Sequence, residues 1–134
     1  MDNMNLTKLV ENAIALYKGA KTDKEIVDSA EKMESVYMLC GSRRITGKKE
    51  LKDLLKDGMA ASEKAKGNLI KSIRNMKQEK QYEELKEYGK IIKHLEDAHE
   101  TPRKETVFIY DYYGSKWWVQ MNMNDGVLVE VSEI

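Results

Sequence analysis

The chain has 134 residues, 34% of them charged, and its 23 basic and 23 acidic side chains give a formal net charge of zero. This length is enough for a core that needs neither disulfides nor a metal, and the lack of an apolar run of about 20 residues excludes a membrane-spanning helix. Cys40 is the only cysteine, which excludes an internal disulfide, and we interpret it as a small buried hydrophobe in a cytoplasmic protein without a secretory signal.

Apolar residues recur at helical spacing through the first 40 residues. The first stripe begins at Leu6 and predicts a helix over residues 5–18. Thr22 and Glu25 have the spacing of a capping box, in which the Thr hydroxyl and the Glu carboxylate satisfy the free amides of a helix start. We therefore expect a second helix to begin after Thr22 and to end at Gly41, because glycine favours the left-handed conformation that ends many helices.

A third apolar stripe extends over Leu51–Met76 in steps of four and three residues. Small residues within it, such as Gly58, would allow another helix to approach closely. Gly67 leaves two alternatives, because it either ends this helix or lies inside one long helix at a modest cost in stability. The stripe resumes at Leu85, and the helical part is expected to end before Pro102, since proline disfavours helical geometry in the residue before it.

Strand-like alternation replaces the helical pattern after Pro102, where six of the ten aromatic residues fall within residues 106–134. A two-residue loop with Gly114 in its first position predicts a hairpin that pairs Tyr112 with Trp117. This register places the large apolar residues on one face, which must be covered by helices. The residues of that face are Phe108, Tyr110, Tyr112, Trp117, Val119, Met121, Val129 and Val131.

A second turn precedes the last strand. A three-residue loop that ends at a left-handed Gly126 pairs Met121 with Val129 and Val119 with Val131. A two-residue loop would turn the last strand over, because a slip of one residue moves every side chain to the other face. The apolar pattern therefore favours the longer loop.

These patterns together predict an α+β protein that forms a single domain over residues 1–134. A bundle of three to four helices is expected over about residues 5–100, and one of these helices is long if Gly67 lies inside it. A three-stranded antiparallel β-meander is expected over about residues 105–134.

The second face of the meander carries large side chains where solvent is expected. Ile109, Tyr113, Trp118 and Gln120 combine exposed aromatic groups with polar neighbours, as protein-binding surfaces do. We predict that these four residues bind a protein partner. The alternative is that a helix covers this face too, or that Trp118 packs along the sheet.

Residues 43–77 hold eleven basic and only four acidic side chains. Arg43 and Arg44 stand in a loop before a helix, and Lys48 and Lys52 follow one helical turn apart, so these four residues form a candidate anion-binding site. The alternative is a solvated face whose lysines pair with nearby carboxylates. The loop is not a nucleotide-hydrolysing phosphate loop, because Ser42 replaces its first glycine and no Ser or Thr follows the Gly-Lys pair.

No catalytic or metal-binding constellation stands out. His94 and His99 are five residues apart, whereas histidines that bind zinc from one helix are three or four apart, so neither a metal nor a cofactor is expected. The sequence therefore favours a non-enzymatic regulator, inhibitor or assembly factor that binds a protein and self-associates through its helices, as a dimer in the simplest case. The alternative is a binder of a phosphorylated ligand, either a nucleotide signal or nucleic acid; a membrane is not expected as a partner, and an enzyme is the third hypothesis.

Overall fold

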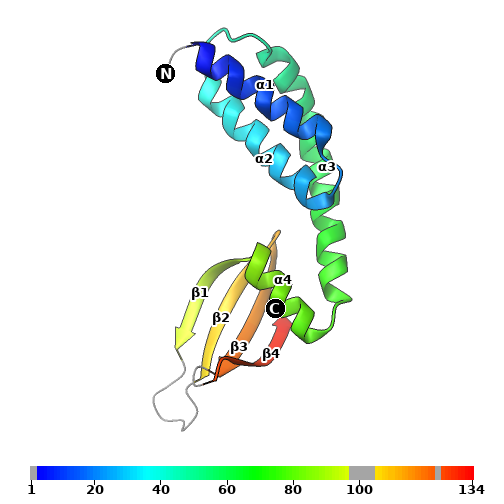
Figure 1. The fold of residues 1–134 in the computed structure, drawn as a ribbon, viewed down its shortest axis with the longest axis vertical. Helices are drawn as coiled ribbons and strands as arrows, with labels where there is room; N and C mark the ends of the chain where they lie inside the picture. Colours follow the sequence, from blue (N-terminus) through cyan, green and yellow to red (C-terminus); the bar gives the residue numbers. More distant parts are fainter. Residues whose placement is uncertain (1–2, 97–104, 123–124) are drawn as a thin grey trace. The chain divides into compact units, whose positions relative to one another are not determined.

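The computed structural model describes residues 3–96, 105–122 and 125–134, and the chain divides into two compact units, Met1–Leu69 and Ile70–Ile134. The helices are α1 (Asn3–Gly19), α2 (Asp23–Cys40), α3 (Lys48–Arg74) and α4 (Gln78–Tyr88). The strands are β1 (Lys90–Glu96), β2 (Glu105–Tyr112), β3 (Ser115–Asn122) and β4 (Val127–Glu133), in an antiparallel sheet of order β1-β2-β3-β4 (Figure 1). The predicted α+β class, with helices before an antiparallel meander, is confirmed. In the described part of the chain, no helix has the length and apolar character needed to cross a membrane.

The second helix begins and ends as its local sequence predicts. The Thr22 hydroxyl accepts a hydrogen bond from the Glu25 amide at 3.2 Å and donates one to the Glu25 carboxylate at 3.0 Å, so the capping box is formed. Helix α2 ends at Cys40, and Gly41 follows with φ of 52°. The capping residues at the two ends of this helix therefore suffice to define its boundaries.

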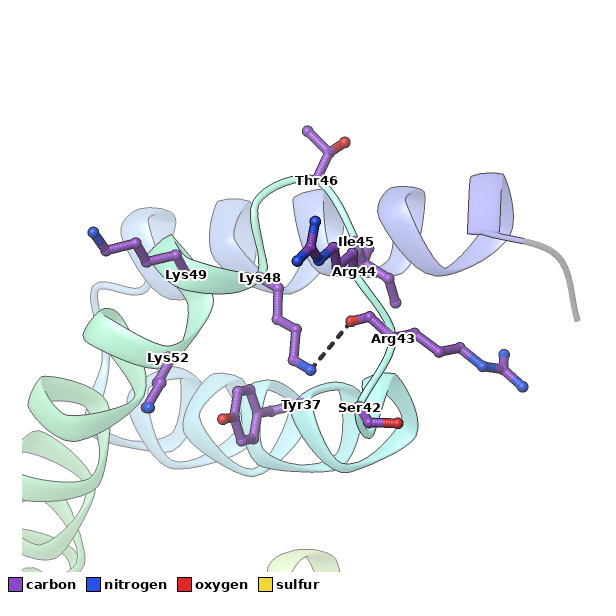
Figure 2. Close-up of a pocket in the computed structure, with 9 residues that line it drawn as sticks. All are labelled: Tyr37, Ser42, Arg43, Arg44, Ile45, Thr46, Lys48, Lys49 and Lys52. Carbon is purple, nitrogen blue, oxygen red and sulfur yellow. Dashed lines mark hydrogen bonds between the residues drawn. The ribbon is translucent and has the colours of Figure 1, made fainter.

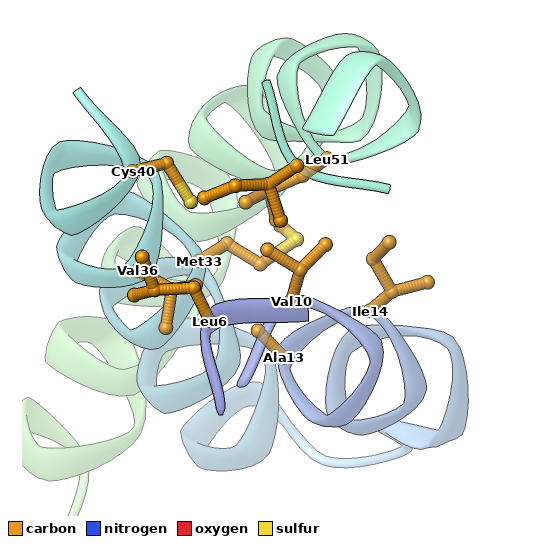
Figure 3. Close-up of a cluster of buried hydrophobic side chains, with 9 residues drawn as sticks. Leu6, Val10, Ala13, Ile14, Met33, Val36, Cys40 and Leu51 are labelled. Carbon is orange, nitrogen blue, oxygen red and sulfur yellow. The ribbon is translucent and has the colours of Figure 1, made fainter. Parts of the chain in front are cut away.

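The core of the first unit lies between α1, α2 and the start of α3. Figure 3 shows its side chains converging from the three helices, and all of them are at most 8% exposed. Cys40 is fully buried among them as a free thiol, in agreement with its interpretation as a small hydrophobe. The cluster consists of Leu6, Val10, Ala13, Ile14, Met33, Val36, Cys40, Ile45 and Leu51.

Helix α3 continues through Gly67, which decides between the two alternatives for this glycine in favour of one long helix. The role predicted for Gly58 is also observed. A Cβ atom at this position would lie 2.6 Å from the terminal methyl group of Met33 and 3.5 Å from the Tyr17 ring, so only glycine leaves room for these side chains as they stand. The helical part ends earlier than expected, because α4 stops at Tyr88.

A fourth strand, β1, occupies residues that were expected to be helical. Ile91, Ile92 and Leu95 continue the helical spacing of α4, yet Lys90–Glu96 pairs antiparallel with β2. The strand contains an irregularity between Ile91 and Lys93, and this bulge breaks the alternation that would have revealed a strand. The meander therefore has four strands instead of three. The predicted helix end at Pro102 lies outside the described residues.

The first predicted hairpin has the right faces but the wrong turn. The loop consists of Tyr113 and Gly114, with φ of 51° and 96°, so Tyr112 pairs with Ser115, and Tyr110 instead of Tyr112 pairs with Trp117. The two-residue hairpin turn whose twist matches that of the flanking strands requires a left-handed conformation at both loop residues. The register differs from the prediction by two residues, which leaves the paired side chains of β2 and β3 on their predicted faces.

The pairing predicted for the second hairpin is correct far from the turn and wrong near it. Val119 pairs with Val131 as predicted, and Gly126 has the expected left-handed φ of 69°. A register shift after Gln120 then pairs Met121 with Leu128, which takes the place predicted for Val129. Val129 is consequently 45% exposed instead of facing the core.

Helix α4 covers the apolar face of the sheet within the second unit (Figure 1). Leu85 is fully buried, and the Tyr112 hydroxyl donates a hydrogen bond to the Glu84 carboxylate at 2.8 Å. The Tyr82 hydroxyl lies 3.1 Å from the Met121 sulfur. Burial, together with the bond to Glu84, raises the pKa of Tyr112. Directional contacts therefore fix the position of α4 on the sheet.

Candidate functional site

The loop between α2 and α3, residues 41–47, carries the two arginines of the predicted anion site. It leaves α2 at Gly41, where the Arg43 amide donates to the Cys40 carbonyl at 3.0 Å, and it enters α3 after Gly47, whose φ is 83°. A Cβ atom on Gly47 would lie 3.3 Å from a Val10 methyl group. Left-handed backbone and close contact with α1 thus favour glycine at this position.

This loop and the first turns of α3 line an open pocket of about 640 Å³ (Figure 2). All four residues of the predicted anion site line it, although they come from a loop and from a helix. Every charged residue of its lining is a cation, and no carboxylate takes part. The lining consists of Tyr37, Ser42, Arg43, Arg44, Ile45, Thr46, Lys48, Lys49 and Lys52.

Lys48 has a different role from its neighbours. Its ammonium group donates hydrogen bonds to the Gly41 carbonyl and, at 3.2 Å, to the Arg43 carbonyl, and it lies 5.7 Å from the centroid of the Tyr37 ring. These carbonyls follow the C-terminus of α2, where a positive charge offsets the partial negative charge of the helix end. Lys48 therefore holds the loop in place, with part of its donor capacity already used.

The other cations of the pocket test the alternative that these lysines pair with carboxylates. Arg44, Lys49 and Lys52 are exposed, and none of them makes an ion pair with a described residue. The carboxylate of Glu50, in the first turn of α3, pairs instead with Lys18 at 2.7 Å. Like-charged groups without neutralising partners create a positive potential that attracts anions.

Tyr37 and Lys49 belong to the pocket but were not predicted as site residues. Tyr37 is half-buried, and Figure 2 shows its ring between the side chains of Lys48 and Lys52. In the sequence it is one member of the apolar stripe of the second helix, which predicts packing and nothing more. The signal that could have found it is its position one turn before Gly41, where the basic loop turns back.

The predicted protein-binding residues are brought together only in part. Ile109 pairs directly with Trp118 across β2 and β3, on the face away from α4, and Gln120 lies two residues further along β3. Tyr113 lies in the turn instead of on this face, and its ring meets the Tyr112 ring edge-on at 4.7 Å. Ile109 is only 9% exposed, so its predicted exposure is wrong, and the part of this face open to a partner consists of the half-buried Trp118 and Gln120.

His94 lies on β1 instead of a helix, and His99 lies outside the described residues. The His94 ring stacks on the Phe108 ring with centroids 4.8 Å apart, which is a packing role. Within the described ranges, no three side chains of His, Cys, Asp or Glu gather as a metal ion would require.

Comparison of the chain with known proteins identifies no relative. No protein-family model matches the chain, and no curated protein or solved structure matches it either. Function is therefore inferred from the residues of the two surfaces described above.

Proposed function

We propose that this chain is a binding protein for a phosphorylated ligand, which it holds in the pocket between the α2–α3 loop and α3. The observation that carries the proposal is the composition of the lining, whose charged residues are all cations, and three of these, Arg44, Lys49 and Lys52, make no ion pair with a described residue. Such a lining favours a ligand with several negative charges, because each added anionic group finds a cation within the same pocket.

The two kinds of cation would contribute differently. A guanidinium group presents a planar fork of donors that matches two phosphate oxygens, so Arg44 is suited to orient the ligand. An ammonium group acts as a point charge, and Lys49 and Lys52 supply two of them on the exposed side of α3. The Ser42 and Thr46 hydroxyls also line the pocket and add neutral donors.

A titration calorimetry experiment with inorganic tripolyphosphate tests this proposal. The double variant Arg44→Ala/Lys52→Ala should lose affinity by about ten-fold or more, since hydrogen bonds to charged groups contribute about 1.5–3 kcal/mol each. The matched control is Lys56→Ala/Lys64→Ala, which removes two exposed cations of α3 that do not line the pocket.

The logarithm of the binding constant of the wild-type protein should also fall linearly with the logarithm of the salt concentration, as ion release requires. An equal loss in the two double variants would show that net charge, and not the pocket, attracts the ligand. Absence of tripolyphosphate binding at low salt would refute the proposal.

A second candidate function is capture of a protein partner by the sheet face opposite α4, in a chain that also self-associates through its helices. Trp118 favours it, because this half-buried ring lies on the face away from α4 beside the buried Ile109, and partly open aromatic groups are typical of interface centres. Trp118→Ala should abolish partner capture while circular dichroism stays unchanged. Light scattering that gives the 15.5 kDa mass of one chain at every concentration would exclude the self-association.

A further inference from the structure

The cations of the pocket are spread over more than the width of one phosphate group. Lys48 and Lys52 are four residues apart, which corresponds to about 6 Å along a helix. Figure 2 shows Lys49 and Lys52 on one side of Lys48 and Arg43 on the other. Because the Lys48 ammonium in the middle already donates to two carbonyls, the ligand would be bound by Arg44, Lys49 and Lys52, and three separate cations suit a chain of phosphates better than a single one.

The Tyr37 ring gives the pocket a surface that phosphate groups alone would not use. Lys48 lies 5.7 Å from the ring centroid and holds it by a cation–π contact. Ile45 is the one aliphatic residue of the lining, and it is only 8% exposed. The ring is therefore the main apolar surface that the pocket offers, and it lies among the groups that would bind phosphate.

The volume of the pocket agrees with a ligand that has both a chain of phosphates and an aromatic group. About 640 Å³ lies within the range of about 300–1,000 Å³ that is usual for sites of drug-sized molecules. This volume has room for a base and a sugar beside the phosphates. Aromatic side chains stack on every kind of base, because each base has a π-face.

We infer that the ligand is a nucleoside polyphosphate, whose phosphates bind Arg44, Lys49 and Lys52 and whose base packs against Tyr37. This inference rests on the proposed function, and it adds the chemical class of the ligand. Tyr37 then serves as the residue that distinguishes a nucleotide from other polyanions, while the cations supply affinity for both.

Calorimetric titrations with ATP and with inorganic tripolyphosphate separate these roles. Tyr37→Leu should weaken ATP binding by about ten-fold, which is within the range measured when aromatic stacking partners of bases are removed, and should change tripolyphosphate binding less than two-fold. Tyr37→Phe keeps the ring and is the matched control, so it should bind ATP as the wild type does. Thermal unfolding followed by circular dichroism verifies that both variants are folded.

A measurement on the wild-type protein covers the case in which Tyr37→Leu does not fold. Nuclear Overhauser contacts between the adenine protons of bound ATP and the Tyr37 ring protons should appear, and their absence would overturn the inference. Equal binding of ATP and tripolyphosphate in all three proteins would also overturn it while leaving the proposed function intact. Failure of both ligands to bind would refute the proposed function itself.

Discussion

The helical unit (Met1–Leu69) and the sheet unit (Ile70–Ile134) bury different kinds of side chain. The core of the helical unit is made of aliphatic side chains with one Met and one Cys, and none of them needs a strong hydrogen bond. The sheet unit buries Tyr110, Tyr112 and Trp117, and its helix is held by polar contacts such as the bond from Tyr112 to Glu84. Loss of volume should therefore dominate the effects of mutations in the first unit, whereas in the second unit, where Leu85 and Val119 are also fully buried, loss of hydrogen bonds adds to loss of volume.

The two units also differ in the surroundings of one arginine side chain in each. In the sheet unit, Arg74 forms two hydrogen bonds of 2.8 Å to the Glu133 carboxylate, which also accepts one from the Ser115 hydroxyl at 2.7 Å. In the helical unit, Arg44 lines a pocket that contains no carboxylate. Arg74 therefore has a carboxylate partner within the chain, whereas no carboxylate lines the pocket beside Arg44, and this contrast supports the proposed binding of an anion there.

The largest effect is expected from a cavity in the helical core. Leu51→Ala removes a fully buried side chain and should lower the free energy of unfolding by about 3 kcal/mol, because surrounding helices fill the space only in part. Leu16→Ala is the matched control, since Leu16 is 55% exposed and its loss should cost less than about 0.5 kcal/mol. Urea denaturation followed by circular dichroism measures both values. Similar losses in the two variants would contradict the proposed core.

A smaller effect is expected from the polar contacts of the sheet unit. Tyr112→Phe removes the hydroxyl that donates to Glu84 and should cost about 1.5 kcal/mol, as is typical of a bond to a charged acceptor. Tyr82→Phe removes a hydroxyl whose partner is the Met121 sulfur, a weak acceptor, and should cost less than about 0.5 kcal/mol. Tryptophan fluorescence in urea reports on this unit. The prediction fails if Tyr82→Phe is the more destabilising of the two.

The helical unit was largely predictable from sequence because its signals are local. The capping box at Thr22 and the glycine at position 41 each act within a few residues, so the boundaries of α2 need no tertiary information. Gly67 could not be assigned in this way. A mid-helix glycine costs only about 1 kcal/mol, which the packing of a long helix easily offsets.

The sheet unit was predicted less well because its pairing depends on bulges. The helical spacing of Leu85, Ile92 and Leu95 crosses the end of α4 without a change, and the bulge near Ile91 hides the strand that begins at Lys90. The faces of β2 and β3 were nevertheless right, since an error of two residues preserves them.

The candidate site was predictable in its charges but not in its shape. The cations from Arg43 to Lys52 stand out in the sequence, and the structure gathers them in one pocket. Tyr37 could not be recognised, because an aromatic residue in an apolar stripe usually packs in the core. Its contact with Lys48 depends on the path of the loop, which only the folded chain defines.

Acid should act on the sheet unit through Glu133. Hydrogen bonds from Arg74 and Ser115 lower the pKa of Glu133 from 4.5 to about 2. The stabilisation is therefore complete above pH 4.5 and is lost as the pH falls toward 2, where the folded carboxylate takes up a proton. Because Glu133 and Arg74 are partly open to solvent, screening by water keeps the effect small.

The test compares thermal midpoints of the wild type and of Glu133→Gln between pH 5 and pH 2 by tryptophan fluorescence. The difference between the two proteins should shrink as the pH falls, since the wild type loses the ion pair that the variant never has. Glu130→Gln, on the same strand, is the control and should leave the pH profile unchanged. A constant difference across this range would contradict the assignment.

The smallest effect is expected where two contributions oppose each other inside α3. Gly58→Ala gains about 1 kcal/mol of helix propensity, but the added methyl group must displace the end of Met33, which is fully buried. Gly67→Ala makes the same gain with no atom within 4 Å of the new methyl group, so it should stabilise the protein by about 1 kcal/mol. Gly58→Ala should instead fall within about 0.5 kcal/mol of the wild type, because crowding in a packed core offsets the gain. If both variants are equally stabilised in urea denaturation, Met33 moves freely and the close approach at Gly58 does not constrain this core.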